Sequence, residues 1–181
     1  GRLLSRILLG PRIVARVKSD KLYLVGFMGA GKSTVARTIG KRIGWRVEDV
    51  DERIETRERR SIAAIFSQSG EAYFRQVERD VLMELVPLRE AVVATGGGTF
   101  VDPESRAAML TDGAVAWLDI PLQQVVERLP PDGRRPLAAD RLQLEQLFLR
   151  RQISYEQAHV RIDGTLPADE VVERLLEWIG Y

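Results

Sequence analysis

A glycine-rich run after a short apolar segment constrains this chain more than any other feature. Residues 26–34 read GFMGAGKST and fit the phosphate-binding pattern G-x-x-x-x-G-K-[ST]. The apolar residues 22–25 before it predict a strand, and a helical pattern begins at Lys32. Glycines let the backbone turn so that N–H groups point at phosphate oxygens, and the helix adds the positive end of its dipole. The run therefore predicts a P-loop rather than a glycine-rich turn that binds nothing.

The P-loop indicates which groups would hold a nucleotide. The expected phosphate-binding residues are Gly29, Ala30, Gly31, Lys32, Ser33 and Thr34. Lys32 would reach the β and γ phosphates, and the Ser33 hydroxyl would ligate magnesium. We therefore expect ATP and Mg²⁺ as cofactors, while the reaction must be inferred from the surrounding residues.

Length and composition exclude several classes of protein. A chain of 181 residues is expected to form one domain. It has no cysteine, which excludes disulfides, thiolate metal sites and a cysteine nucleophile. The net charge of +1 argues against a nucleic-acid partner, and no apolar run approaches the roughly 20 residues that cross a membrane. We expect a cytoplasmic, monomeric protein with small-molecule partners.

The first 20 residues differ in charge from the rest of the chain. They hold five of the 27 basic side chains and one of the 26 acidic ones. We interpret residues 1–20 as a basic N-terminal extension that packs on the domain or on a neighbouring chain, with a targeting peptide as the alternative. Residues 21–181 are then the domain that carries the P-loop.

Strand-like and helical patterns alternate along residues 21–181. This alternation predicts an α/β fold, a single domain with a five-stranded parallel sheet covered by helices on both faces. Ligands of such sheets bind at the carboxyl ends of the strands. The expected strands are 22–25, 45–49, 91–95, 114–119 and 160–163, and the expected helices are 32–43, 61–86 with a break near Gly70, 103–110, 121–129, 141–157 and 168–179.

The segment 130–140 is rich in turn-forming residues and predicts a mobile lid. It contains Arg134 and Arg135, and Arg151 follows in the next predicted helix. An arginine delivered by a closing lid stabilises the negative charge of a phosphoryl group in transfer. A solvated run of charges is the alternative.

Charged residues follow the predicted strands. Asp49, Val50 and Asp51 come at the carboxyl end of the second one, and in an extended segment alternate side chains share one side. One carboxylate could bind in the coordination shell of the magnesium ion, and the other could accept the proton of an attacking hydroxyl. A solvated surface pair is the more common meaning of D-x-D alone, but the position beside a P-loop favours the site.

Three glycines and a pair of charges complete the candidate site. The glycines at 96–98 follow the third strand, and without Cβ atoms a ligand can lie directly on their backbone. Arg75 and Glu78 are three residues apart on a predicted helix, so Glu78 can hold Arg75 in position to bind a carboxylate. A flexible turn and a surface ion pair are the alternatives.

Five segments in this order and spacing resemble the shikimate kinase family. They are GFMGAGKST, DVDERIE, SIAAIF-x3-GEAYFRQVE, GGG and RRPL, and the resemblance covers about residues 21–177. It implies a nucleoside-monophosphate-kinase-like P-loop fold and transfer of the γ-phosphoryl group of ATP to the 3-hydroxyl of shikimate, a step of chorismate and aromatic amino acid biosynthesis. The family usually has R-x-P-L-Y where this chain has RQISY at 151–155.

The resemblance also implies residue roles. Asp51 resembles the aspartate that binds shikimate hydroxyls and acts as base, and Asp49 resembles its neighbour on the magnesium side. The resemblance likewise implies that Arg75 and Arg151 bind the carboxylate and that Gly97 and Gly98 contact the ring. It also implies that Arg128 stacks on adenine and that the lid residue Arg135 contacts the phosphates.

Two other functions stay open from the residues alone. One is a different small-molecule P-loop kinase, acting on gluconate or a nucleoside monophosphate. The other is a catalytically silent relative, which would be expected to lack Lys32, Asp51 or the arginines, although all are present.

Overall fold

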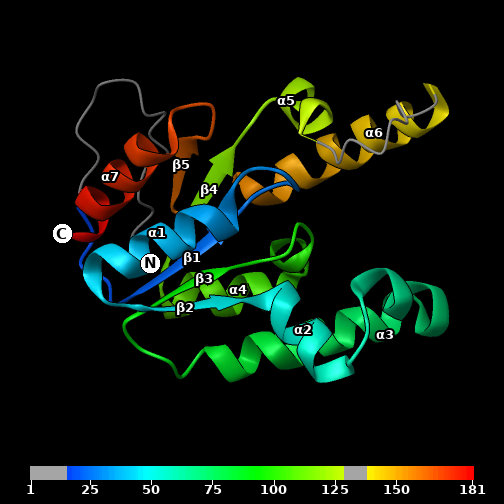
Figure 1. Ribbon diagram of the computed structural model, residues 1–181, viewed down its shortest axis with the longest axis horizontal. Helices are drawn as coiled ribbons and strands as arrows, with labels where there is room; N and C mark the ends of the chain where they lie inside the picture. Colours follow the sequence, from blue (N-terminus) through cyan, green and yellow to red (C-terminus); the bar gives the residue numbers. More distant parts are fainter. Residues whose placement is uncertain (1–15, 129–137) are drawn as a thin grey trace.

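The sheet of this protein has five parallel strands in the order β2-β3-β1-β4-β5. The structure is a computed structural model and describes residues 16–128 and 138–181 (Figure 1). The strands are β1 (Lys21–Val25), β2 (Arg46–Asp49), β3 (Ala91–Ala94), β4 (Ala114–Asp119) and β5 (Val160–Asp163). Strands β1, β3 and β4 are almost wholly buried because helices cover both faces.

In the described residues, helices lie between these strands and after the last of them. They are α1 (Lys32–Ile43), α2 (Val50–Glu58), α3 (Ile62–Leu85), α4 (Pro103–Asp112), α5 (Leu122–Glu127), α6 (Ala138–Tyr155) and α7 (Ala168–Ile179), with a 3-10 turn η1 at Thr99–Val101. The connection through α1 runs along the sheet in the direction opposite to the connections through α3 and α4. Right-handed crossovers therefore place α1, with α7 beside it, on one face and α3 with α4 on the other (Figure 1).

The direction of connection reverses at the centre of the sheet, and this reversal positions the site. Residues Leu24 of β1, Ala94 of β3 and Asp49 of β2 lie side by side in register. The loop after β1 and the glycine turn after β3 are therefore neighbours at the carboxyl edge of the sheet. In open α/β sheets this switch point is where ligands bind.

The predicted fold is confirmed, with two corrections. All five strands were expected, and the predicted break near Gly70 is present, where a φ of 83° interrupts α3. The extended reading of Asp49-Val50-Asp51 is wrong, because α2 begins at Val50. The side chain of Asp49 accepts a hydrogen bond from Glu52 N and caps this helix, so only Asp49 lies on the strand.

The boundary of the predicted lid also changes. Residues 138–140 of the expected 130–140 segment belong to α6, while residues 130–137, with Arg134 and Arg135, lie outside the described residues. Of the expected extension, residues 16–20 are described. Val17 N donates to Trp178 O of α7 (2.7 Å), which joins this end of the chain to the domain. No helix in the described residues is long and apolar enough to span a membrane.

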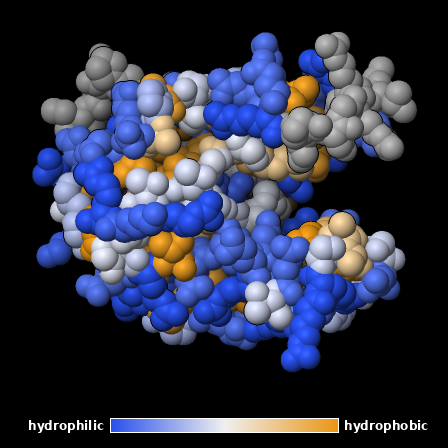
Figure 2. All heavy atoms as spheres, in the orientation of Figure 1, coloured by the Kyte–Doolittle hydropathy of each residue, from blue (hydrophilic) through white to orange (hydrophobic). Residues whose placement is uncertain are grey.

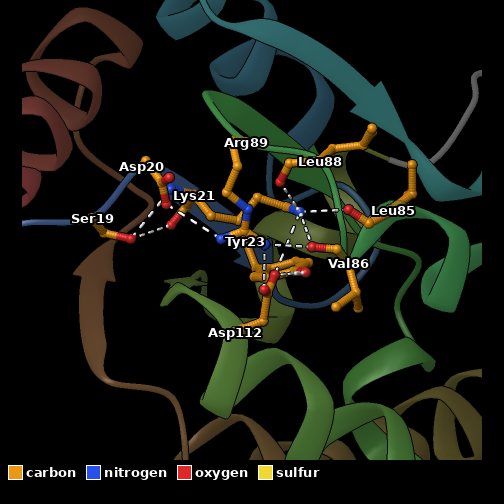
Figure 3. A network of polar contacts seen from close by, with 9 residues as sticks. All are labelled: Ser19, Asp20, Lys21, Tyr23, Leu85, Val86, Leu88, Arg89 and Asp112. Atoms are coloured by element: carbon orange, nitrogen blue, oxygen red, sulfur yellow. Dashed lines mark hydrogen bonds and ion pairs between the residues drawn. The ribbon is translucent and has the colours of Figure 1, made fainter.

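A charged network lies at the amino-terminal edge of the sheet, opposite the switch point (Figure 3). Lys21 opens β1 with a fully buried side chain, and its Nζ donates to Leu85 O (2.5 Å) and Leu88 O (2.8 Å) after α3. Its counter-charge is Asp112, whose Oδ2 lies 3.4 Å from Nζ and accepts from Tyr23 Oη (2.6 Å). The network ties the end of α3 to the central strand.

Candidate active site

The P-loop has the backbone that its glycines permit. Gly26, Gly29 and Gly31 have φ values of 147°, 76° and 91°, which disfavour residues with a Cβ. A Cβ on Gly26 would also lie 2.6 Å from Leu118 O of β4. Gly31 caps α1, so the N–H groups of the first turn of this helix face the loop. The predicted phosphate-binding surface is thus built from one strand end and one helix start.

Lys32 is buried in the first turn of α1 and turns back over the loop. Its Nζ donates to Gly26 O (2.5 Å) and Phe27 O (3.0 Å). Burial lowers the pKa of Lys32 to about 8, although the charge of Asp51 raises it. An incoming phosphate would supply the negative charge that this ammonium group otherwise obtains only from carboxylates nearby.

Ser33 and Asp49 bring two oxygen ligands together. Ser33 Oγ donates to Asp49 Oδ2 (2.6 Å), so the hydroxyl on α1 and the carboxylate at the end of β2 are in contact. In sites where Mg²⁺ also binds substrate phosphates, the protein usually supplies only one or two oxygen ligands. The predicted pair therefore fits this ion by the chemistry of its atoms. Arg128, after α5, donates from Nη1 to Gly29 O (2.7 Å), which places it at the same loop.

Asp51 lies in the first turn of α2, close to the glycine turn. Burial raises the pKa of Asp51 to about 6, and the charges of Asp49 and Glu78 add to the shift while Lys32 opposes it. A carboxylate with this pKa is ionised at neutral pH and still binds a proton more tightly than an ordinary aspartate. These are the properties of a general base.

Each glycine of the 96–98 turn lies against one charged side chain. A Cβ on Gly96 would lie 2.7 Å from Asp51 Oδ1, and one on Gly97 would lie 2.7 Å from Arg151 Nη1. A Cβ on Gly98 would lie 2.5 Å from Arg75 Nη1. These three charged groups occupy the space where side chains of the turn would lie, and this explains why the turn consists of glycines.

The two arginines reach this turn from different helices. Arg75 of α3 donates from Nη1 to Glu78 Oε1 (2.8 Å), as the sequence predicts. Arg151 of α6 has its guanidinium 5.5 Å from the ring centroid of Phe27. Burial lowers the pKa of Arg151; the nearby Tyr155 opposes this shift and the charge of Arg75 adds to it. Two cationic groups facing one space favour an anion between them.

A cavity of 380 Å³ lies between these helices, and its size suits a small ring acid. Figure 2 shows the surface hollowed in this region, between the part built from α6 and the part built from α2 and α3. The lining residues come from α3, the glycine turn with η1, and α6: Glu71, Arg75, Gly98, Val101, Asp102, Leu147, Arg150 and Arg151.

The structure brings the described site residues together, with Arg135 outside the described part of the chain. Two further contacts were not expected from the sequence. Tyr155 is buried and donates from its hydroxyl to Gly97 O (2.5 Å), and Phe27 of the P-loop lies beside Arg151. The position of Tyr155 four residues after Arg151, on the same helix face, was the available signal. His159 accepts a hydrogen bond at Nδ1 from Val115 N of β4.

Comparison with known proteins identifies the family of this chain. The family model described as "Shikimate kinase" matches residues 28–180. A shikimate kinase of Persephonella marina is 41% identical over 157 residues, which cover 85% of this chain and 96% of the relative.

Solved structures agree. The shikimate kinase of Aquifex aeolicus, 35% identical, superposes with a TM-score of 0.80 and covers 88% of this chain and 95% of its own. The Acinetobacter baumannii shikimate kinase in complex with shikimate, 33% identical, has a TM-score of 0.82 and covers 88% and 92%. The chain therefore belongs to the shikimate kinase family, the ATP-dependent kinases that act on shikimate.

Proposed function

We propose that this protein uses the cavity between α3 and α6 to hold shikimate while the γ-phosphoryl group of ATP passes to its 3-hydroxyl. The products are shikimate 3-phosphate and ADP, in the biosynthesis of chorismate and aromatic amino acids. The observation that carries the proposal is the glycine turn, which has Asp51 at Gly96 and the two arginines at Gly97 and Gly98. A candidate base and a carboxylate-binding pair thus lie against one glycine turn, and the two arginines of the pair line the small cavity.

The arginines would bind and orient the acceptor. Arg75 and Arg151 would share its carboxylate, and Glu78 would keep the Arg75 fork in one rotamer. The backbone of Gly97 and Gly98 would contact the ring, because no side chain covers it. With the carboxylate fixed at this end, the hydroxyl groups of the ring are directed toward Asp51 and the P-loop.

Asp51 would remove the proton of the reacting hydroxyl. The oxygen then forms a bond to the γ phosphorus, and the bond from that phosphorus to the β–γ bridging oxygen breaks, which releases ADP. The proton remains on Asp51, and a pKa of about 6 lets it pass to water at neutral pH.

The nucleotide would be held by the residues of the P-loop. The N–H groups of Gly29, Ala30, Gly31, Ser33 and Thr34 would donate to phosphate oxygens, and Lys32 would neutralise their charge. Arg128 would stack on adenine, and Arg135 would meet the phosphates. Mg²⁺ would be held by Ser33 and Asp49, and when bound it would neutralise charge on the β and γ phosphates.

We propose that the protein is a monomer, and sedimentation velocity would test this. We propose the cytoplasm as the compartment, where ATP is supplied.

An ATP-consumption assay with Mg²⁺ over shikimate, quinate, gluconate and AMP would test the function. We expect turnover with shikimate and a product heavier by one phosphoryl group in mass spectrometry. Turnover of gluconate or AMP with shikimate left unchanged would contradict the proposal. Asp51→Asn serves as the matched inactive control, because it changes one atom of the candidate base.

A further inference from the structure

The buried hydroxyl of Thr99 connects the glycine turn to helix α3. Thr99 begins η1 directly after Gly98, and none of its surface is exposed. Its Oγ1 accepts a hydrogen bond from Gly96 N (3.0 Å) and donates one to Glu78 Oε2 (3.0 Å). A hydroxyl has one hydrogen to donate and lone pairs that accept, so one group makes both contacts.

Glu78 extends this connection to the candidate carboxylate-binding arginine. Its side chain is 2% exposed, and its other oxygen, Oε1, accepts from Arg75 Nη1 (2.8 Å). A continuous series of hydrogen bonds therefore runs from the backbone of Gly96 through Thr99 and Glu78 to Arg75. Each of the two Glu78 oxygens has one partner in this series.

The series spans the two ends of the candidate acceptor site. Gly96 abuts Asp51, since a Cβ there would lie 2.7 Å from Oδ1, and Gly98 abuts Arg75. A shift of the turn relative to α3 would change the spacing between the candidate base and the candidate carboxylate-binding group. Catalysis depends on such spacings, since small misplacements of bound groups cost large factors in rate.

We propose that Thr99 is a positioning residue for the phosphoryl acceptor, which it orients by fixing the glycine turn to Glu78 and thereby setting the spacing between Asp51 and Arg75. This inference rests on the proposed function of the same cavity. Thr99 acts through Glu78 and the backbone of Gly96, and its effect should therefore fall on shikimate rather than on the nucleotide.

The chemistry of burial supports a large effect. Without the hydroxyl, the buried N–H of Gly96 loses its acceptor and the buried Glu78 Oε2 loses its donor. Leaving such groups unpaired is costly, most of all for a charged group. Movement of the turn or of Glu78 toward other partners would relieve this cost, and either movement disturbs Arg75.

The test compares Thr99→Ser with Thr99→Ala, because both remove the methyl group and only serine keeps the hydroxyl. Calorimetry would give the dissociation constants of shikimate and ADP. Steady-state kinetics would give the KM values and kcat. We expect the alanine variant to bind shikimate at least about tenfold more weakly and the serine variant to stay within about threefold of wild type. The affinity for ADP should stay within about twofold in both.

Thr95, which lies between the end of β3 and Gly96, supplies a matched control. It is also a buried threonine beside the turn, but its Oγ1 donates to Leu24 O (2.8 Å) of β1. In Thr95→Ser and Thr95→Ala, we therefore expect no selective loss of shikimate affinity relative to ADP affinity. Thr99→Val keeps the volume without the hydroxyl and replaces alanine if the smaller side chain prevents folding.

The possible outcomes are separable. Equal shikimate affinity in the serine and alanine variants, or an equal loss for ADP, would overturn the positioning role while leaving the proposed function intact. Failure of both hydroxyl-free variants to fold, with serine folding, would also overturn it, because the hydroxyl would then serve stability alone. Wild-type protein that binds ADP but not shikimate would overturn the proposed function, and this inference with it.

Discussion

Asp51→Asn should make the protein more stable while it removes most of the activity. Burial raises the pKa of this carboxyl from 3.8 to about 6, so the folded protein binds its proton more tightly than the unfolded chain does. Ionising Asp51 at neutral pH therefore costs stability. Two pKa units correspond to roughly 3 kcal/mol, at 1.36 kcal/mol per unit.

The sign of the effect sets its pH dependence. The cost is fully present above about pH 6 and disappears as the pH falls toward about 4, where the carboxyl is protonated in both states. Asparagine is neutral throughout, so its advantage should exist only at the higher pH. At 2–4 °C per kcal/mol for a chain of this size, a stabilisation of roughly 3 kcal/mol raises the Tm by about 6–12 °C.

Differential scanning calorimetry at pH 7.5 and pH 4 would measure the difference in Tm between the asparagine variant and wild type. The kinase assay would show a fall in kcat of about 10²–10⁴-fold. Glu52→Gln is the matched control, because it removes a charge from the same helical turn at a side chain that is 72% exposed. It should change stability by less than about 1 kcal/mol. An asparagine variant no more stable than wild type at pH 7.5, or equally stabilised at pH 4, would refute the reasoning.

Three further changes test other parts of the structure. Gly98→Ala should raise the KM for shikimate about tenfold and leave ADP affinity unchanged, because its Cβ would displace the Arg75 guanidinium, and an equal loss for ADP would contradict this. Binding of ADP at pH 8.5 should take up protons, since phosphates raise the pKa of Lys32 from about 8, and calorimetric enthalpies that do not vary with buffer would exclude it. Asp112→Asn should lower the urea midpoint by the equivalent of about 3–5 kcal/mol, because the buried Lys21 loses its counter-charge, and an unchanged midpoint would show that the pair contributes little.

The parts of the site that were predictable from the sequence depend on local geometry. The positive φ values of Gly29 and Gly31 follow from a motif whose residues are adjacent in the chain. The Arg75–Glu78 pair was equally accessible, because a spacing of three on a helix brings side chains together whatever else the chain does. The strand order then brings these local units to one edge of the sheet.

The parts that were not predictable depend on contacts between distant segments or on a competing local structure. Asp51 was expected on an extended segment, but Asp49 caps a helix and draws Val50 and Asp51 into its first turn. Thr99 contacts Glu78 of α3, and Tyr155 of α6 contacts Gly97 of the glycine turn, and a single sequence does not state which distant residues meet in this way. Lys21 would be expected to be exposed from its type alone, yet it is fully buried because backbone carbonyls and Asp112 surround it.

Two buried lysines near the opposite ends of β1 show how the same chemistry serves structure at one end and function at the other. Lys21 has a complete set of fixed partners, with carbonyls at the end of α3 and the carboxylate of Asp112. Lys32 donates only to the carbonyls of Gly26 and Phe27, and within the described residues no carboxylate lies within ion-pair distance of its Nζ.

The difference has a physical consequence for the central strand. A charge with a permanent counter-ion gains little from a new anion, whereas a buried ammonium group that hydrogen-bonds to carbonyls and has no ion-paired carboxylate gains a larger interaction when phosphate arrives. The amino-terminal edge of the sheet can thus be rigid around Lys21, because Asp112 is ion-paired with both Lys21 and Arg89. At the carboxyl edge, no carboxylate of the described residues is ion-paired with Lys32, so in the proposed function the attraction between that ammonium group and the transferring phosphoryl group would be available for catalysis.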